Sequence, residues 1–168
     1  MAKVKHYVIV SITLGAIAAA SAALIGVTNL VTRERIADNE RKAIQKGLNY
    51  IFDTEVEVPE AQDLADYKYV TCYYSLGDEK YAFRTDGSNM YGKVSLIIGF
   101  NNEEFVRLYV IKNEQTYAST LVDNYINPLN SDEREYDDVK CGATYGATLV
   151  RDMIDDASKA VKKINGKE

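Results

Sequence analysis

The chain has 168 residues with 20 basic and 25 acidic side chains, so its formal net charge at neutral pH is −5. This acidic balance argues against nucleic-acid binding, because a protein neutralises phosphates with lysine and arginine. One histidine and two cysteines exclude a histidine-based catalytic triad and the usual zinc, haem and iron–sulfur sites.

The N-terminal segment is the first predicted element. Residues 8–31 contain no charged side chain, and as a helix of about 36 Å they would cross a hydrocarbon core of about 30 Å. Lys3 and Lys5 precede the segment and charges of both signs follow it, so the positive-inside rule predicts a cytoplasmic N-terminus. We therefore predict a cytoplasmic tip and a single-pass cell-membrane anchor over residues 1–31, and one extracytoplasmic domain over residues 32–168.

A cleaved secretion signal is the alternative interpretation, with Ala20-Ser21-Ala22 as its cleavage site. The apolar stretch continues nine residues beyond Ala22, which favours an uncleaved anchor. Small residues dominate the middle of the span, and such residues let neighbouring membrane helices approach closely. We therefore expect contact with other membrane subunits.

Hydropathy patterns and turn residues predict the elements that follow. A helix is expected over residues 32–52, with one apolar face formed by Ile36, Ile44, Leu48 and Ile51. Strands are expected at residues 67–76, 80–84, 92–100 and 104–111, separated by turns at 77–79, 86–89 and 101–103. A short helix is expected at 116–126 and an amphipathic helix at 146–164, with loops at 53–66 and 127–138. These elements predict an α+β fold with helices packed on an antiparallel sheet.

A small-residue loop before the last helix carries the candidate chemistry. Gly142 and Ala143 allow a bulky group to approach, and Thr144 brings a hydroxyl to the beginning of a helix. The first turn of a helix has unpaired N–H groups and a positive dipole end, which suit a phosphate. A simpler interpretation is that Thr144 or Thr148 only caps the helix.

The segment from Asp138 to Thr144, Asp-Val-Lys-Cys-Gly-Ala-Thr, resembles the flavinylation motif Asp-x-x-Ser/Thr-Gly-Ala-Thr. That motif belongs to the FMN-binding domain of the G subunit of Rnf complexes and the C subunit of Na⁺-translocating NADH:quinone reductases. The N-terminal span and residues 30–36, residues 91–99 and residues 114–116 are similar to further segments of that family, in the same order.

The resemblance implies covalent FMN, esterified through its phosphate to Thr144 by a Mg²⁺-dependent flavin transferase. It also implies an electron-carrier subunit of a membrane-bound, ion-translocating ferredoxin:NAD oxidoreductase, rather than a complete enzyme. Other membrane subunits and the transferase would be the partners. Asp138 would hold a transferase-bound Mg²⁺ or shape the loop.

Three features depart from the family pattern: Cys141 replaces Ser or Thr, Gly146 follows where Ser or Thr is frequent, and residues 117–119 replace Pro-Gly-Leu. Tyr91, Tyr117 and Tyr145 are candidate walls for the flavin ring, or simply members of a tyrosine-rich core. The residues expected to hold or surround the flavin are Tyr91, Gly92, Glu114, Thr116, Tyr117, Asp138, Cys141, Gly142, Ala143, Thr144, Tyr145 and Thr148.

Two other functions remain open from the sequence. One is a stand-alone, membrane-anchored flavoprotein for extracytoplasmic electron transfer. The other is a non-redox, membrane-anchored binding domain with a degenerate motif. Cys72 and Cys141 are also candidates for a disulfide in an oxidising compartment.

Overall fold

The computed structural model describes residues 2–64 and 66–166, without the side chains of residues 2–6, 30–31 and 34. Lys3 and Lys5, on which the predicted orientation depends, lie outside the described side chains. The chain divides into two compact units, Met1–Arg41 and Lys42–Glu168.

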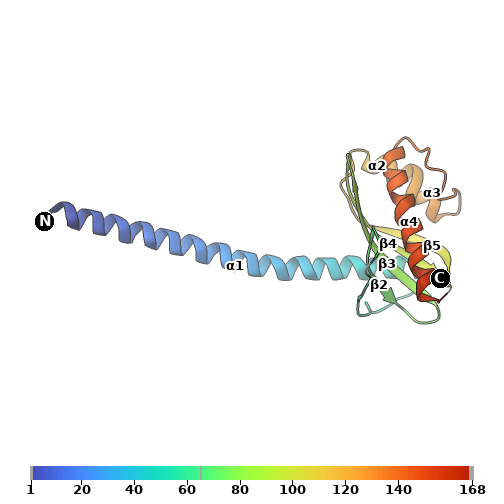
Figure 1. Cartoon of the computed structure of the whole chain (residues 1–168), viewed down its shortest axis with the longest axis horizontal. Helices are drawn as coiled ribbons and strands as arrows, with labels where there is room; N and C mark the ends of the chain where they lie inside the picture. Colours follow the sequence, from blue (N-terminus) through green and yellow to red (C-terminus); the bar gives the residue numbers. More distant parts are fainter. Residues whose placement is uncertain (1, 65, 167–168) are drawn as a thin grey trace. The chain divides into compact units, whose positions relative to one another are not determined.

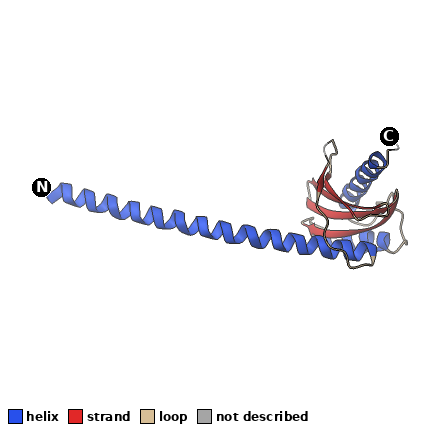
Figure 2. Ribbon diagram, turned by 90° about the horizontal axis from the view of Figure 1, so that it is seen from below, coloured by secondary structure: helices blue, strands red, loops and turns tan. Residues whose placement is uncertain are grey.

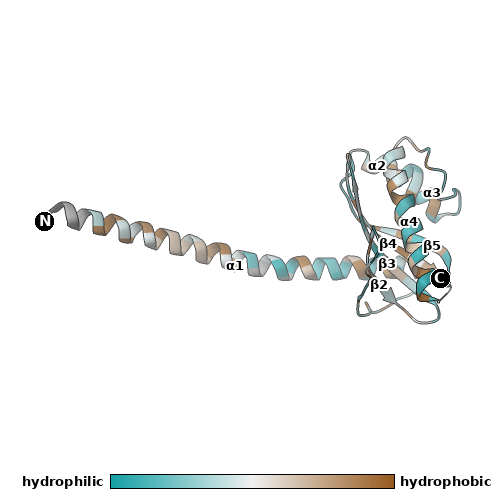
Figure 3. Ribbon diagram, in the orientation of Figure 1, coloured by the Kyte–Doolittle hydropathy of each residue, from teal (hydrophilic) through white to brown (hydrophobic). Residues whose placement is uncertain are grey.

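The first unit is formed by most of helix α1, which runs from Ala2 to Phe52. Within it, the 23-residue segment Tyr7–Asn29 is long and apolar enough to cross a membrane, and an 18-residue stretch of it has a mean hydropathy of 2.3. Figure 3 shows this apolar stretch in brown. The predicted apolar helix at the N-terminus is confirmed, and its length and composition are consistent with a single-pass anchor.

The second unit contains an antiparallel five-stranded sheet in the order β1-β2-β3-β4-β5. Each strand pairs with the next along the chain, and Figure 1 shows the resulting meander. Four strands match the predicted ones, while the two-residue β1 lies in a segment predicted as loop. The strands are β1 (Gln62–Asp63), β2 (Val70–Ser75), β3 (Lys80–Asn89), β4 (Gly92–Asn101) and β5 (Glu104–Asn113).

The predicted turn at residues 86–89 is wrong, because these residues continue β3 and pair with β4 through Asn89 opposite Gly92. The hydroxyl of Ser95 donates to the carboxylate of Asp86 across the two strands. Chain reversal occurs instead at Met90 and Tyr91. Polar residues that favour turns are thus held in a strand by cross-strand pairing.

Helices cover both faces of the sheet in the second unit, as Figure 2 shows. On one face, α4 and the segment between β5 and α4 enclose the larger core. On the other face, Ile44, Leu48 and Ile51 at the end of α1 pack in a smaller core with Ile97. The predicted α+β arrangement is confirmed. The remaining helices are α2 (Ala118–Leu121), the π-helix η1 (Val122–Ile126), α3 (Asn127–Asn130) and α4 (Thr144–Ile164).

Three helix predictions need correction. Residues 127–130 are helical rather than loop. Pro128 follows a π-helical turn, and because proline has no N–H it cannot give the carbonyl of Asn124 an α-helical partner. Helix α4 begins at Thr144, two residues before the predicted start. Ile36, which was predicted on one apolar face with Ile44, Leu48 and Ile51, is 58% exposed, whereas the other three are buried.

Candidate functional site

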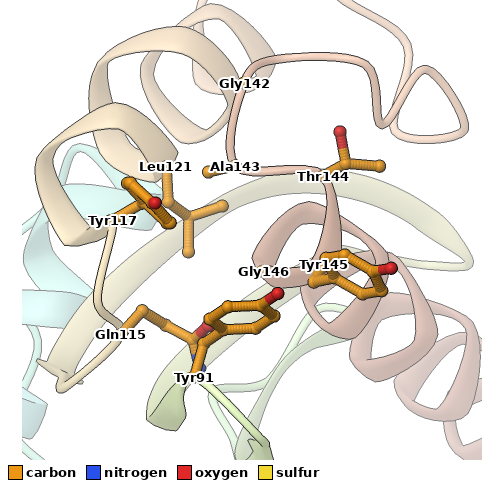
Figure 4. A pocket seen from close by; sticks show the side chains of 9 residues that line it. All are labelled: Tyr91, Gln115, Tyr117, Leu121, Gly142, Ala143, Thr144, Tyr145 and Gly146. Carbon is orange, nitrogen blue, oxygen red and sulfur yellow. The ribbon is translucent and has the colours of Figure 1, made fainter.

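A cavity of about 260 Å³ lies at the beginning of α4. Its walls come from the β3–β4 turn, the segment after β5, α2 and the loop that precedes α4, as Figure 4 shows. Segments far apart in the sequence therefore meet at one place. The lining residues are Tyr91, Gln115, Tyr117, Leu121, Gly142, Ala143, Thr144, Tyr145 and Gly146.

The loop before α4 is held in a conformation that needs glycine. Gly142 has a φ of +84°, in the left-handed region that glycine adopts without steric cost. The side-chain amide of Asn124 donates to the backbone carbonyl of Cys141 at 3.1 Å, which ties the loop to η1. These constraints bring the small residues of the motif to the edge of the cavity.

Neither candidate threonine caps α4, so that simpler interpretation is wrong. The N-cap residue is Ala143, which has no side-chain capping bond. Thr144 is the first residue of the helix, and the Thr148 hydroxyl donates to the carbonyl of Thr144 at 2.8 Å. The hydroxyl of Thr144 therefore has no capping role within the domain.

Thr144 is exposed and lies at the rim of the cavity, above the tyrosine rings in Figure 4. The N–H of Ala147 is bonded to the carbonyl of Ala143 at 3.0 Å, so the three preceding amides have no intrahelical partner. The first turn contains no acidic side chain. A helix end of this kind favours an anion at the position of the Thr144 side chain.

Three tyrosine rings form the aromatic part of the wall. The ring centroids of Tyr91 and Tyr145 are 5.3 Å apart with an interplanar angle of 34°. Those of Tyr91 and Tyr117 are 6.4 Å apart and inclined at 52°. Because Tyr117 is 56% and Tyr145 is 66% exposed, both rings have free surface that a planar ligand can cover.

The position of Tyr91 depends on close packing against the segment after β5. The N–H of Thr116 donates to the carbonyl of Tyr91 at 2.9 Å. Gly92 has a φ of +135°, and a Cβ at this residue would lie 2.1 Å from the carbonyl oxygen of Glu114. Only glycine permits this approach, so Gly92 and Thr116 support the cavity from behind.

Of the residues predicted to surround a flavin, six line the cavity: Tyr91, Tyr117, Gly142, Ala143, Thr144 and Tyr145. The other six are not among the residues that line it: Gly92, Glu114, Thr116, Asp138, Cys141 and Thr148. Glu114 forms an exposed ion pair with Lys112 at 2.7 Å, and this hydrogen bond lowers the pKa of its carboxyl.

Asp138 shapes the loop. Its carboxylate pairs with Arg134 at 3.2 Å and accepts a hydrogen bond from the N–H of Lys140 at 3.3 Å. The Arg134 guanidinium also donates to the carbonyl of Asp138 at 2.7 Å. These contacts fix the path of the chain toward Cys141. Among the described residues, no three acids, cysteines or histidines are grouped to hold a metal ion.

Both cysteines are free thiols. Cys72 packs with the smaller core and Cys141 with the larger one, on opposite faces of the sheet. The sheet between them explains why the disulfide considered from the sequence does not form in this structure.

Three lining residues were not predicted: Gln115, Leu121 and Gly146. Gln115 lies between the two predicted residues Glu114 and Thr116. This position was the only indication in the sequence that Gln115 belongs to the site. A Cβ on Gly146 would lie 3.1 Å from a methyl group of Leu121, so glycine here widens the cavity. This packing depends on how α2 and α4 meet, which no local pattern reveals.

Fold and site together define a class of protein: an α+β domain with a tyrosine-lined cavity, preceded by one apolar helix long enough to cross a membrane. Residues 1–51 match the family model of the RnfG N-terminal region. This match covers less than a third of the chain and shows that its N-terminal part is similar to that of RnfG proteins. The resemblance found in the sequence is confirmed for these residues. The matched residues include none that line the cavity. Among curated proteins, none matches the chain.

Proposed function

We propose that the chain carries FMN, linked by a phosphoester to Thr144, and serves as an electron-carrier subunit of an Rnf-type complex. The observation that carries this proposal is the exposed hydroxyl of Thr144 in the first turn of α4, beside a tyrosine-lined cavity. A hydroxyl there can be esterified without breaking a capping bond. The unpaired amides of the helix end would stabilise the phosphate.

The cavity suits part of a flavin rather than the whole cofactor. Its volume of about 260 Å³ is below the range of about 300–1,000 Å³ usual for small-molecule sites. The exposed rings of Tyr117 and Tyr145 extend the apolar surface beyond the cavity. A planar ring system would therefore rest against the tyrosines while the phosphate stays at the helix end.

FMN, when bound, supplies the electron chemistry; the protein contributes binding, orientation and electrostatics. In this proposal Thr144 holds the phosphate, the tyrosines orient the ring, and Gly142 leaves space for the linkage. A tether through the phosphate leaves the ring without a covalent substituent from the protein. The cofactor is then retained outside the cytoplasm, where we propose the domain lies.

Maturation in this proposal needs a flavin transferase as a transient partner. Its approach requires an accessible acceptor, and Thr144 is exposed whereas Thr148 is half-buried and bonded to the carbonyl of Thr144. This difference favours Thr144 as the acceptor over Thr148, which ends the second Gly-Ala-Thr sequence. Asp138 is also exposed and is therefore accessible to the transferase.

The test is the intact mass of the full-length chain after co-expression with a flavin transferase. We expect wild type and Thr148→Val to gain one FMN less one water, and Thr144→Val to keep the mass of the bare polypeptide. The two valine variants remove the same hydroxyl from neighbouring turns, so each is a control for the other. An unmodified wild-type chain would refute covalent FMN, and an adduct on Thr144→Val would refute this acceptor.

A further inference from the structure

The side chain of Gln115 is buried at the cavity wall and is held by two hydrogen bonds. It is 7% exposed. Its Nε2 donates to Oδ1 of Asn89 at 3.0 Å and to the backbone carbonyl of Gly92 at 2.6 Å. Both donors of the amide are therefore committed to the protein.

Backbone groups fix which end of each amide carries oxygen. Oδ1 of Asn89 accepts from the N–H of Tyr91 at 2.8 Å, and Nδ2 of Asn89 donates to the carbonyl of Tyr145 at 3.1 Å. A flipped Asn89 would set an amide nitrogen against an N–H and an oxygen against a carbonyl. Since Oδ1 of Asn89 must face Gln115, the Gln115 atom that donates to it is Nε2.

The carbonyl oxygen of Gln115 is consequently directed to the cavity. It lies 3.4 Å from the position that a Cβ would take on Gly146, one of the lining residues. No described residue donates a hydrogen bond to it. An acceptor at the cavity wall that has no donor within the described protein is available to a ligand N–H.

We propose that Oε1 of Gln115 accepts a hydrogen bond from the imide N–H of the flavin pyrimidine ring, and that Asn89 is the positioning residue that holds this oxygen in place. The inference rests on the proposed function and deepens it. The imide is the one ring N–H of an oxidised isoalloxazine, so a fixed acceptor selects that edge of the ring. Gln115 would thereby set which end of the flavin enters the cavity.

Gln115→Met tests the hydrogen bond, because methionine keeps the length and unbranched shape of the side chain and removes the amide. We expect the intact mass to retain one FMN, since esterification takes place at Thr144. The visible absorption band should shift relative to wild type. The midpoint potential should become more positive, because an acceptor on the imide raises the electron density of the oxidised ring. Gln45→Met makes the same change at an exposed residue outside the cavity. It should leave the absorption band and the midpoint potential as in wild type.

Asn89→Ala tests the positioning role. This substitution leaves Gln115 in place but frees its amide to rotate. The absorption band and the midpoint potential should therefore shift in the same direction as in Gln115→Met, by a smaller amount. Circular dichroism establishes that each variant is folded. A flavinylated, folded Gln115→Met chain with wild-type spectrum and potential would overturn the role of Gln115 alone. A wild-type chain without the FMN mass would overturn the inference together with the proposed function.

Discussion

Gly92 combines an unusual backbone conformation with a close contact. Its φ is +135°, and a Cβ would lie 2.1 Å from the carbonyl oxygen of Glu114. We expect Gly92→Ala to lower the free energy of unfolding by more than about 2 kcal/mol, because backbone strain and a backbone clash add. The measurement is chemical denaturation.

Gly77→Ala is the matched control for this prediction. Gly77 also has a positive φ, +81°, but a Cβ there meets nothing within 4 Å. We expect Gly77→Ala to lower the free energy of unfolding by about 1 kcal/mol, from the left-handed conformation alone. Equal losses for the two variants would show that the contact with Glu114 contributes nothing.

Asp155 gives a prediction about pH. Partial burial and the neighbouring carboxylate of Asp137 raise its pKa, against an opposing effect from Arg151. A carboxyl with a raised pKa in the folded state binds its proton more tightly there, so its ionisation destabilises the fold as pH rises. Asp155→Asn should therefore raise the melting temperature at pH 7.

The gain from Asp155→Asn should disappear below about pH 4, where the aspartate is protonated in both the folded and unfolded chain. Thermal melts of wild type and variant across this range give the difference directly. A gain that is constant with pH would mean that the ionisation of Asp155 is not its source.

At the scale of residues, the sequence led to part of the cavity wall. Thr144, Gly142 and the three tyrosines were predicted from a motif and its neighbours, and all line the cavity. Gln115 was not predicted, because the direction of its carbonyl is decided by Asn89, a residue far away in sequence. Asp138 belongs to the motif, yet its contacts lie within the loop.

The end of α1 is an element whose contribution to stability can be measured. Leu48 is fully buried in the smaller core between this helix and the sheet. We expect Leu48→Ala to cost about 2–5 kcal/mol, as large-to-small changes in a core do. Ile36→Ala is the control, since Ile36 lies on the same helix but is 58% exposed.

The Ile36 variant should change the free energy of unfolding by about 0.5 kcal/mol or less. Urea denaturation of both full-length variants in detergent measures the two losses of stability. Similar, small losses would contradict the packing of the α1 end on the sheet.

At the scale of elements, the sequence predicted strands well where apolar residues alternate, as in β4 and β5. It failed where composition and pairing conflict. Residues 86–89 have turn-forming side chains but lie in the long β3–β4 hairpin. Residues 127–130 contain a proline but lie in a helix, since proline is accommodated at its first turn.

For the whole molecule, we predict that the domain faces the outside of the cell. Protease added to intact cells should then degrade the second unit and leave a membrane-bound fragment that contains the apolar helix. This follows from the two lysines that precede the span, because the positive-inside rule retains them in the cytoplasm. Protection of the domain in intact cells, with digestion only after lysis, would reverse the orientation.

Fragment mapping of the tryptic peptide Cys141–Arg151 from the purified, full-length protein tests the central claim most directly. This peptide contains both Thr144 and Thr148, and its fragment ions assign a modification to one or the other. The account predicts a single FMN phosphoester on Thr144 and an unmodified Thr148. A peptide that carries no FMN after co-expression with a flavin transferase, or carries it on Thr148, would contradict the account.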